Sequence, residues 1–219
     1  MARIAPWRVT GAAVAMFLAP YCYGDSISLM GSLNPDDAND VLLFAFMLGS
    51  SSKLTIQTYG YGGSGNAPGG TNAAGIVIPG EGFDPYVSLF AGSGSGATFL
   101  ASNDDGSCPP GMGVSSFCPD STLIQNPLPD RTYTLALSVF DNLSFAENLG
   151  TGTLGDGFIG LGDYFDQITG TLRTSNYAVD ILADTTVTPV ATPEPSSLAL
   201  LGAVIIGALL VRYRRLIWN

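Results

Sequence analysis

Between its two apolar ends, the sequence is a series of short apolar segments separated by clusters of Gly, Asn and Asp. Residues 53–59 (KLTIQTY) alternate apolar and polar side chains, which is typical of a strand with one buried face. Residues 40–48 (DVLLFAFML) are almost continuously apolar, which predicts a strand buried on both faces. Further strands are expected at 26–33, 85–91, 97–102, 132–140 and 177–182. Because no helical period appears between the ends, we expect an all-β fold, an antiparallel β-sandwich.

Two glycine-rich stretches, 60–75 and 148–163, are expected to be long loops. The second contains Gly-x-Gly patterns, but no strand-loop-helix frame surrounds them. A phosphate-binding loop is therefore not predicted.

The charge of the chain excludes several classes of function. The sequence contains no histidine, which excludes Ser-His, Cys-His and zinc-His sites within it. From Asp25 to Asp184, three basic residues stand against seventeen acids, a net charge of −14. Such a surface repels a phosphate backbone, so the chain is not expected to bind nucleic acid. It suits an exported domain that must stay soluble, or one that binds divalent cations.

The N-terminus has the layout of a secretory signal peptide. Two arginines precede an apolar run at 9–20, and smallish residues stand before Asp25. We expect a signal helix in 1–24 that is removed on export. Two alternatives stay open, a retained membrane anchor and a lipoprotein modified at Cys22.

The C-terminus combines a proline-rich segment, a short apolar run and a basic tail. The linker 188–197 carries Pro193-Glu194-Pro195, and the predicted transmembrane helix 198–211 comes next. The stretch 196–211 would span about 24 Å as a helix at ~1.5 Å per residue, short against a ~30 Å hydrocarbon core. The tail 212–219 is expected to stay cytoplasmic, which leaves the acidic domain outside. Its arginines are Arg212, Arg214 and Arg215.

These C-terminal residues resemble the PEP-CTERM sorting signal. In that family, a membrane-embedded exosortase recognises the signal. The resemblance implies recognition at Pro193, Glu194 and Pro195 and removal of the segment C-terminal to them, with only transient membrane anchoring. It also implies export across the inner membrane of a Gram-negative bacterium, to the cell surface or beyond, within an exopolysaccharide or biofilm programme. The alternative is a plain single-span anchor.

A second resemblance rests on GFDPYVSLF at 82–90 and FLASNDDG at 99–106. The two segments look like the Phe-Asp-Pro (FDP) family of exported PEP-CTERM proteins. They are also similar to bacterial pre-peptidase C-terminal domains, which are jelly-roll-like β-sandwiches. The resemblance covers roughly 34–140. We expect a single β-sandwich domain at 25–187.

Acidic residues at the entry to the second expected strand are candidate calcium ligands. Some pre-peptidase domains hold calcium near this place, and Ca²⁺ takes six to eight oxygen ligands. The alternative is an Asx-rich turn that caps its own backbone. The candidates are Asp36, Asp37, Asn39 and Asp40, with Asp104 and Asp105 from a later turn.

Cys108 and Cys118 are the only cysteines that remain after signal removal. In an oxidising compartment they are expected to form a disulfide. The alternative is a redox or metal-binding pair, although a spacing of ten residues does not fit CxxC chemistry.

No pair of acids marks a catalytic site, so we expect no catalytic residues and no enzyme activity, glycoside hydrolysis included. The first hypothesis is a non-catalytic surface or matrix protein associated with exopolysaccharide. The second is a carbohydrate- or protein-binding module, stabilised by calcium. Some aromatic residues could form a sugar-stacking platform, although strand spacing favours packing. They are Tyr59, Tyr61, Phe83, Tyr86, Phe90, Tyr164 and Phe165.

Overall fold

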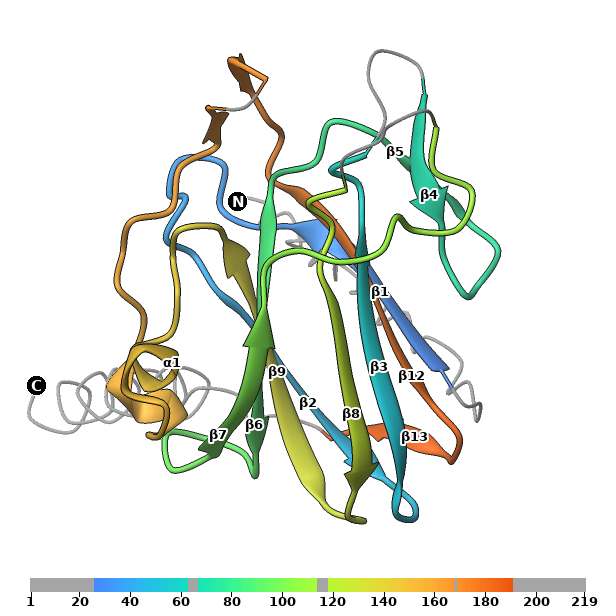
Figure 1. The fold of residues 1–219 in the computed structure, drawn as a ribbon, viewed down its shortest axis with the longest axis vertical. Coiled ribbons are helices and arrows are strands. Elements are labelled where there is room, and N and C mark those ends of the chain that lie inside the picture. Colours follow the sequence, from blue (N-terminus) through green and yellow to red (C-terminus); the bar gives the residue numbers. More distant parts are fainter. Residues whose placement is uncertain (1–25, 63–66, 114–117, 168, 191–219) are drawn as a thin grey trace, which may run out of the picture.

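The computed structural model describes residues 26–62, 67–113, 118–167 and 169–190. Two antiparallel sheets pack against each other, so the predicted β-sandwich is confirmed (Figure 1). The expected signal helix at 1–24 and transmembrane helix at 198–211 lie outside the described residues. Within the described part, no helix has the length and apolar character that crossing a membrane requires.

The first sheet has four strands in the order β1-β12-β3-β8. β1 pairs with β12 without a break, from Ser26 opposite Leu182 to Ser32 opposite Asn176. The register between β3 and β8 shifts near Leu54. The strand bounds are β1 Ser26–Ser32, β3 Ser52–Tyr59, β8 Thr122–Leu128 and β12 Asn176–Ala183.

The second sheet has five strands in the order β13-β2-β9-β6-β7. The predicted strand 85–91 has the bounds of β6, and the other predicted strands differ from the observed ones by at most two residues at either end. β13 pairs with β2; it begins at the predicted domain boundary, 187, and continues past it to Pro189. The bounds are β2 Leu42–Leu48, β6 Pro85–Ala91, β7 Thr98–Asn103, β9 Thr132–Val139 and β13 Val187–Pro189.

The main core lies between the two sheets. Alternate residues of each strand point inward, as the period of two requires. Phe46 of β2 stacks on Tyr133 of β9, with ring centroids 5.8 Å apart. The larger fully buried side chains here include Leu48, Leu54, Ile56, Leu89, Leu135, Leu137 and Ile181.

Both outer faces are partly covered, which decides which strands are buried on both sides. The segment with helix α1 (Phe145–Leu149) and a 3-10 helix (Leu154–Asp156) packs beside β6, β7 and β9, and Ala146 contacts their outer face. Every residue of β9 after the first is therefore buried. The prediction that 40–48 is buried throughout was wrong, because Leu43 is 46% exposed. β2 lies next to the short edge strand β13, so the segment with the two helices does not cover its outer face at Leu43.

β4 (Pro68–Thr71) lies within the expected loop 60–75 and forms a hairpin with β5 (Val77–Pro79), and neither strand was predicted. Ile78 of this hairpin packs on Tyr59 and Ala178, so it covers the outer face of the first sheet. The last pair, β10 (Phe165–Asp166) and β11 (Thr171–Leu172), forms a short ribbon. No strand pattern predicts this ribbon, because two-residue strands are too short to show one.

Candidate functional site

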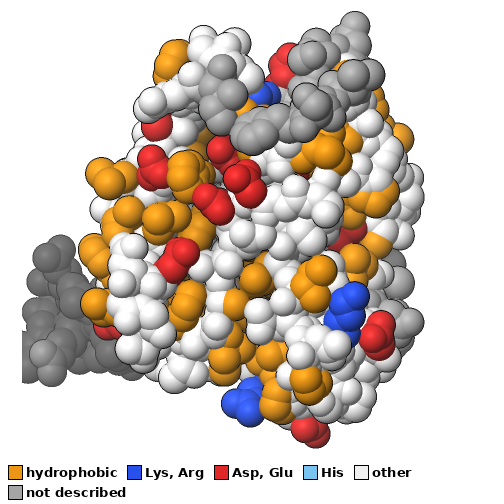
Figure 2. Space-filling model, in the orientation of Figure 1, with side chains coloured by type: hydrophobic (Ala, Val, Ile, Leu, Met, Phe, Trp, Pro, Cys, Tyr) orange, Lys and Arg blue, Asp and Glu red, His pale blue; other side chains and the backbone are white. Residues whose placement is uncertain are grey.

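A polar cavity of about 300 Å³ lies where the second glycine-rich segment and the β10–β11 ribbon meet the start of β6. Four aspartates and one arginine supply most of its charge. In Figure 2, which is drawn in the orientation of Figure 1, acidic side chains gather beside hydrophobic ones in the upper half of the visible face. We call this cavity the acidic pocket. Its lining residues are Asp84, Phe140, Asp141, Leu161, Asp163, Tyr164, Phe165, Asp166, Gln167 and Arg173.

Asp166 and Arg173 anchor one wall of the acidic pocket. Arg173 donates to Asp166 Oδ2 from Nη2 at 2.9 Å and from Nε at 3.0 Å, and both side chains are almost completely buried. The guanidinium also lies 4.1 Å from the ring centroid of Tyr61, whose hydroxyl donates to Asp166 at 2.6 Å. A buried charge pair with these extra donors fixes the wall in one arrangement.

Asp120 is fully buried near this wall and has several hydrogen-bond donors. Its carboxylate accepts the backbone N–H groups of Tyr61 and Gly62 and the hydroxyl of Thr58. Burial raises the pKa of Asp120 to about 6, although these donors and Arg173 oppose the rise. Its hydrogen bonds show a structural role, which is to hold the chain that leaves β3.

Asp84, which begins the Asp-Pro entry to β6, is the least satisfied acid of the acidic pocket. Its Oδ1 is buried and has no hydrogen-bond partner in the described structure. Burial, followed by the charges of Asp105 and Asp104, raises the pKa of Asp84 to about 8. At neutral pH the group is therefore held mainly as the neutral acid, which can donate a hydrogen bond.

The rim of the acidic pocket carries exposed apolar groups. Phe165 is 47% exposed and Leu161 is 66% exposed. The other six aromatics that the sequence suggested for a sugar platform are buried, so of these seven only Phe165 offers an open ring. An exposed ring beside carboxylates, the Gln167 amide and Arg173 is a combination that can contact the apolar face and the hydroxyls of one ligand.

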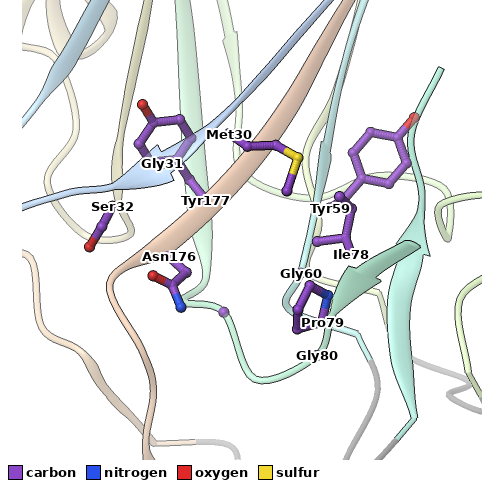
Figure 3. Close-up of a pocket in the computed structure, with 11 residues that line it drawn as sticks. Met30, Gly31, Ser32, Tyr59, Gly60, Ile78, Pro79, Gly80, Asn176 and Tyr177 are labelled. Atoms are coloured by element: carbon purple, nitrogen blue, oxygen red, sulfur yellow. The ribbon is translucent and has the colours of Figure 1, made fainter. Parts of the chain in front are cut away.

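A second hollow, of about 490 Å³, lies between the end of β1 and the β4–β5 hairpin (Figure 3). None of the described residues that line it is charged. Met30 and Asn176 stand on one side, and Ile78 and Pro79 on the other. A Cβ atom at position 31 would lie 2.5 Å from the Tyr177 hydroxyl oxygen, which is a steric clash. Glycine at this position therefore allows the Tyr177 ring to lie where it does.

The structure places the six calcium candidates in two groups. In the first group, Asn34 N and Val41 N donate to the two oxygens of Asp40, and Asn39 N donates to Asp37. The side-chain oxygen of Asn39 accepts from Gly162 N, so most of these oxygens cap nearby backbone.

Asp104 and Asp105 form the second group, because their charges act on Asp84. In the described ranges, no set of three or more acidic or cysteine side chains is arranged to hold a metal ion. The six residues therefore do not fit one calcium site as they stand. Calcium binding stays a prediction, for which the melting temperature should rise with Ca²⁺ and fall with a chelator.

Cys108 and Cys118 form the predicted disulfide, with Cα atoms 5.0 Å apart. Residues 114–117 within the closed loop are outside the described residues. The bridge lies next to Asp120 in sequence. It therefore restrains the chain segment that leads into this buried carboxylate.

Sequence reasoning missed the Asp166–Arg173 pair and the role of Asp120. One signal was available: Arg173 is one of only three basic residues in a strongly acidic region, which favours a specific partner. Nothing in the spacing shows that Tyr61, Asp120 and Arg173 meet, because more than fifty residues separate each from the next.

The fold is that of an all-β sandwich, and the C-terminal segment places the chain in a sorting class. A family model described as the PEP-CTERM protein-sorting motif matches residues 191–215. The predicted sorting residues Pro193, Glu194 and Pro195 lie within this match, as do the three arginines. The motif implies an exported protein that exosortase sorts to the surface. No curated protein matches the chain.

Proposed function

We propose that this chain is a non-catalytic surface or extracellular-matrix protein, associated with exopolysaccharide. The sorting motif at 191–215 is the observation that carries the proposal, because it implies delivery to the surface. Membership of the Phe-Asp-Pro family, and similarity to pre-peptidase C-terminal domains, are part of the same proposal.

The use of the buried acids supports a non-catalytic role. Asp166 is bound to Arg173, Tyr61 and Thr169, and Asp120 is bound to backbone N–H groups. Asp180 accepts from Ser28, Tyr59 and the N–H of Ala73. These carboxylates hold loops to sheets, which is a structural use.

Mass spectrometry of the protein purified from its own host tests the sorting step. We expect a mature chain that starts at Asp25 and ends near Pro195, because exosortase would remove the helix and the basic tail. The matched variant Glu194→Ala should keep its C-terminus and stay in the membrane fraction. Recovery of the natural chain intact through Asn219 would contradict the proposal.

A second candidate function is carbohydrate binding, and the acidic pocket favours it. Phe165 supplies an exposed ring, and Gln167 and Asp163 supply hydrogen-bonding groups on the same cavity. Planar amide and carboxylate groups beside an aromatic ring suit a polyhydroxylated ligand. The ligand would be neutral or cationic, because four aspartates outnumber one arginine in the lining.

Binding of the mature protein to the host's purified exopolysaccharide tests this candidate. We expect saturable binding that weakens at least tenfold in Phe165→Ala. Phe145→Ala is the matched control, because Phe145 is similarly exposed at 44% but does not line the acidic pocket. Equal binding by both variants, or none by the natural protein, would eliminate the second candidate and leave the first standing.

A further inference from the structure

The sandwich has four edge strands, and three of them carry a feature that blocks further pairing. β8 contains Pro127, and β13 has three residues and ends in Pro189. β7 is hydrogen-bonded to a covering segment at the start of its edge, where Phe99 N donates to Gly152 O at 2.9 Å. Proline, short length and a covering segment are the usual protections of a sheet edge.

The fourth edge, β1, has none of these features among the described residues. It has seven residues, Ser-Ile-Ser-Leu-Met-Gly-Ser, with no charge and no proline. Its register with β12 is unbroken, so the strand is regular along its whole length. Among described residues, the backbone of 26–32 hydrogen-bonds only to β12. The N–H and C=O groups on its other side therefore point away from the sheet.

We propose that β1 pairs with β1 of a second copy of this chain, antiparallel about a two-fold axis, to make one continuous sheet. The complete overlap of both strands places Leu29 opposite Leu29 and Ser28 opposite Met30. An isologous contact of this kind closes as a dimer and leaves no further open edge.

Charge limits where a second copy can dock, and β1 is a place where it can. The region from Asp25 to Asp184 carries −14, so most surfaces of two copies repel each other. β1 has no charged residue, although the domain as a whole is acidic. The nearby Asp180 is buried, and its carboxylate accepts hydrogen bonds. Two copies can therefore approach at β1 without placing like charges opposite each other.

The side chains of β1 also suit a continued sheet. Ile27 and Leu29 face the main core, so a partner strand would extend the apolar row between the sheets. Met30 is 47% exposed on the opposite face and would be covered in part. A seven-residue strand pair is a small interface, so we expect a weak dimer that forms where sorting concentrates the chains.

Disulfide cross-linking in the sorting host tests the pairing and its register. Two differently tagged full-length chains are co-expressed, one with Ser28→Cys and the other with Met30→Cys, and the cells are mildly oxidised. We expect a mixed disulfide dimer, because these positions face each other across the axis. Each variant alone should cross-link much less, because identical positions are then diagonal, roughly 7–8 Å apart. Ser26→Cys with Ser32→Cys is the second pair, in case loss of the Ser28 hydrogen bond to Asp180 disturbs folding.

Ile124→Cys in both chains is the control, since Ile124 is 52% exposed on the proline-bearing edge β8. Failure of both β1 pairs to exceed this control would overturn the proposal. Sedimentation of the released protein gives an independent readout. The dimer fraction should rise between low salt and about 0.5 M salt, because screening weakens the repulsion between acidic bodies. Met30→Lys should lower it, and a monomer at every salt concentration would also overturn the pairing.

Discussion

The core between the two sheets and the acidic end of the sandwich, by which we mean the acidic pocket and the segments that line it, are held together in different ways. The core is a set of apolar side chains such as Phe46 and Leu135, whose burial follows from strand alternation. The acidic end depends on a few polar contacts between distant segments, above all Arg173 with Asp166. Apolar packing is non-directional, whereas a buried charge has a large energetic cost unless its partner is in place. In the core, the free energy of unfolding should therefore fall in proportion to the side-chain volume that a substitution removes. At the acidic end, it should fall sharply when a single hydrogen-bond or charge partner is removed.

The largest effect is expected in the core. Phe46→Ala removes a fully buried ring that stacks on Tyr133, and should lower the free energy of unfolding by about 3–5 kcal/mol. Chemical denaturation of the mature protein measures it. Met47→Ala is the neighbouring control, with a side chain 44% exposed and an expected change of about 0.5 kcal/mol or less. Equal effects at both positions would show that β2 is not oriented as described.

Arg173→Met should be nearly as destabilising, by about 3 kcal/mol, because it leaves Asp166 buried without its cation. Tyr61 and Thr169 still donate to Asp166, which keeps the loss at the lower end for a broken buried pair. Arg173→Lys should cost less, since it keeps the charge but loses the second donor and the stacking on Tyr61. A change of under about 1 kcal/mol for Arg173→Met would mean that the pair behaves as an exposed one.

Removal of the disulfide should have an intermediate effect. Replacing Cys108 and Cys118 together by Ser should lower stability by about 2–3 kcal/mol, because the closed loop is short. Thermal unfolding of the natural and variant proteins, each without reductant, gives the difference. The natural protein with reductant should match the variant; a variant that is as stable as the oxidised protein would show that the bridge restrains nothing.

The last effect concerns Asp84 and depends on pH. Its pKa is about 8 in the folded state against an unfolded value near 3.8, so the folded state binds the proton more tightly. The stability from this group is fully present below about pH 4 and is lost as the pH rises through about 8. Asp84→Asn should therefore raise the melting temperature at pH 8.5 and change it little at pH 4.

Asp163→Asn is the matched control for Asp84→Asn. Asp163 is an exposed acid on the same cavity, so its substitution removes a negative charge without changing a buried group. Melting curves from pH 4 to pH 9 for both variants separate the two effects. An identical pH dependence in both would show that repulsion, rather than the burial of Asp84, sets the stability of this end.

Much of the fold was predictable because strand alternation is a local signal. The segments at β1, β3, β6 and β9 show it within seven or eight residues. β8 was missed because Pro127 lies inside it, and proline is uncommon in strands. The burial of β2 was overestimated, because the sequence does not show which outer faces a later segment covers.

The candidate site was less predictable than the fold. Asp84 was noticed in a motif, and Phe165 among seven aromatics, but neither their shared cavity nor the exposure of Phe165 can be deduced from spacing. The calcium candidates were chosen by composition. The structure shows that oxygens of Asp37 and Asp40 accept hydrogen bonds from nearby backbone N–H groups, an arrangement that the sequence allowed as the alternative.

The sequence by itself determined the all-β class, the acidic surface, the disulfide pair and the sorting motif at 191–215. Each of these depends on residues close together in the chain or on composition. Only the tertiary structure decided the order of strands in the sheets, the position of β1 at a sheet edge and the acidic pocket. These depend on contacts such as Arg173 with Tyr61, which join segments far apart in the chain, and such contacts form only when the whole sandwich closes.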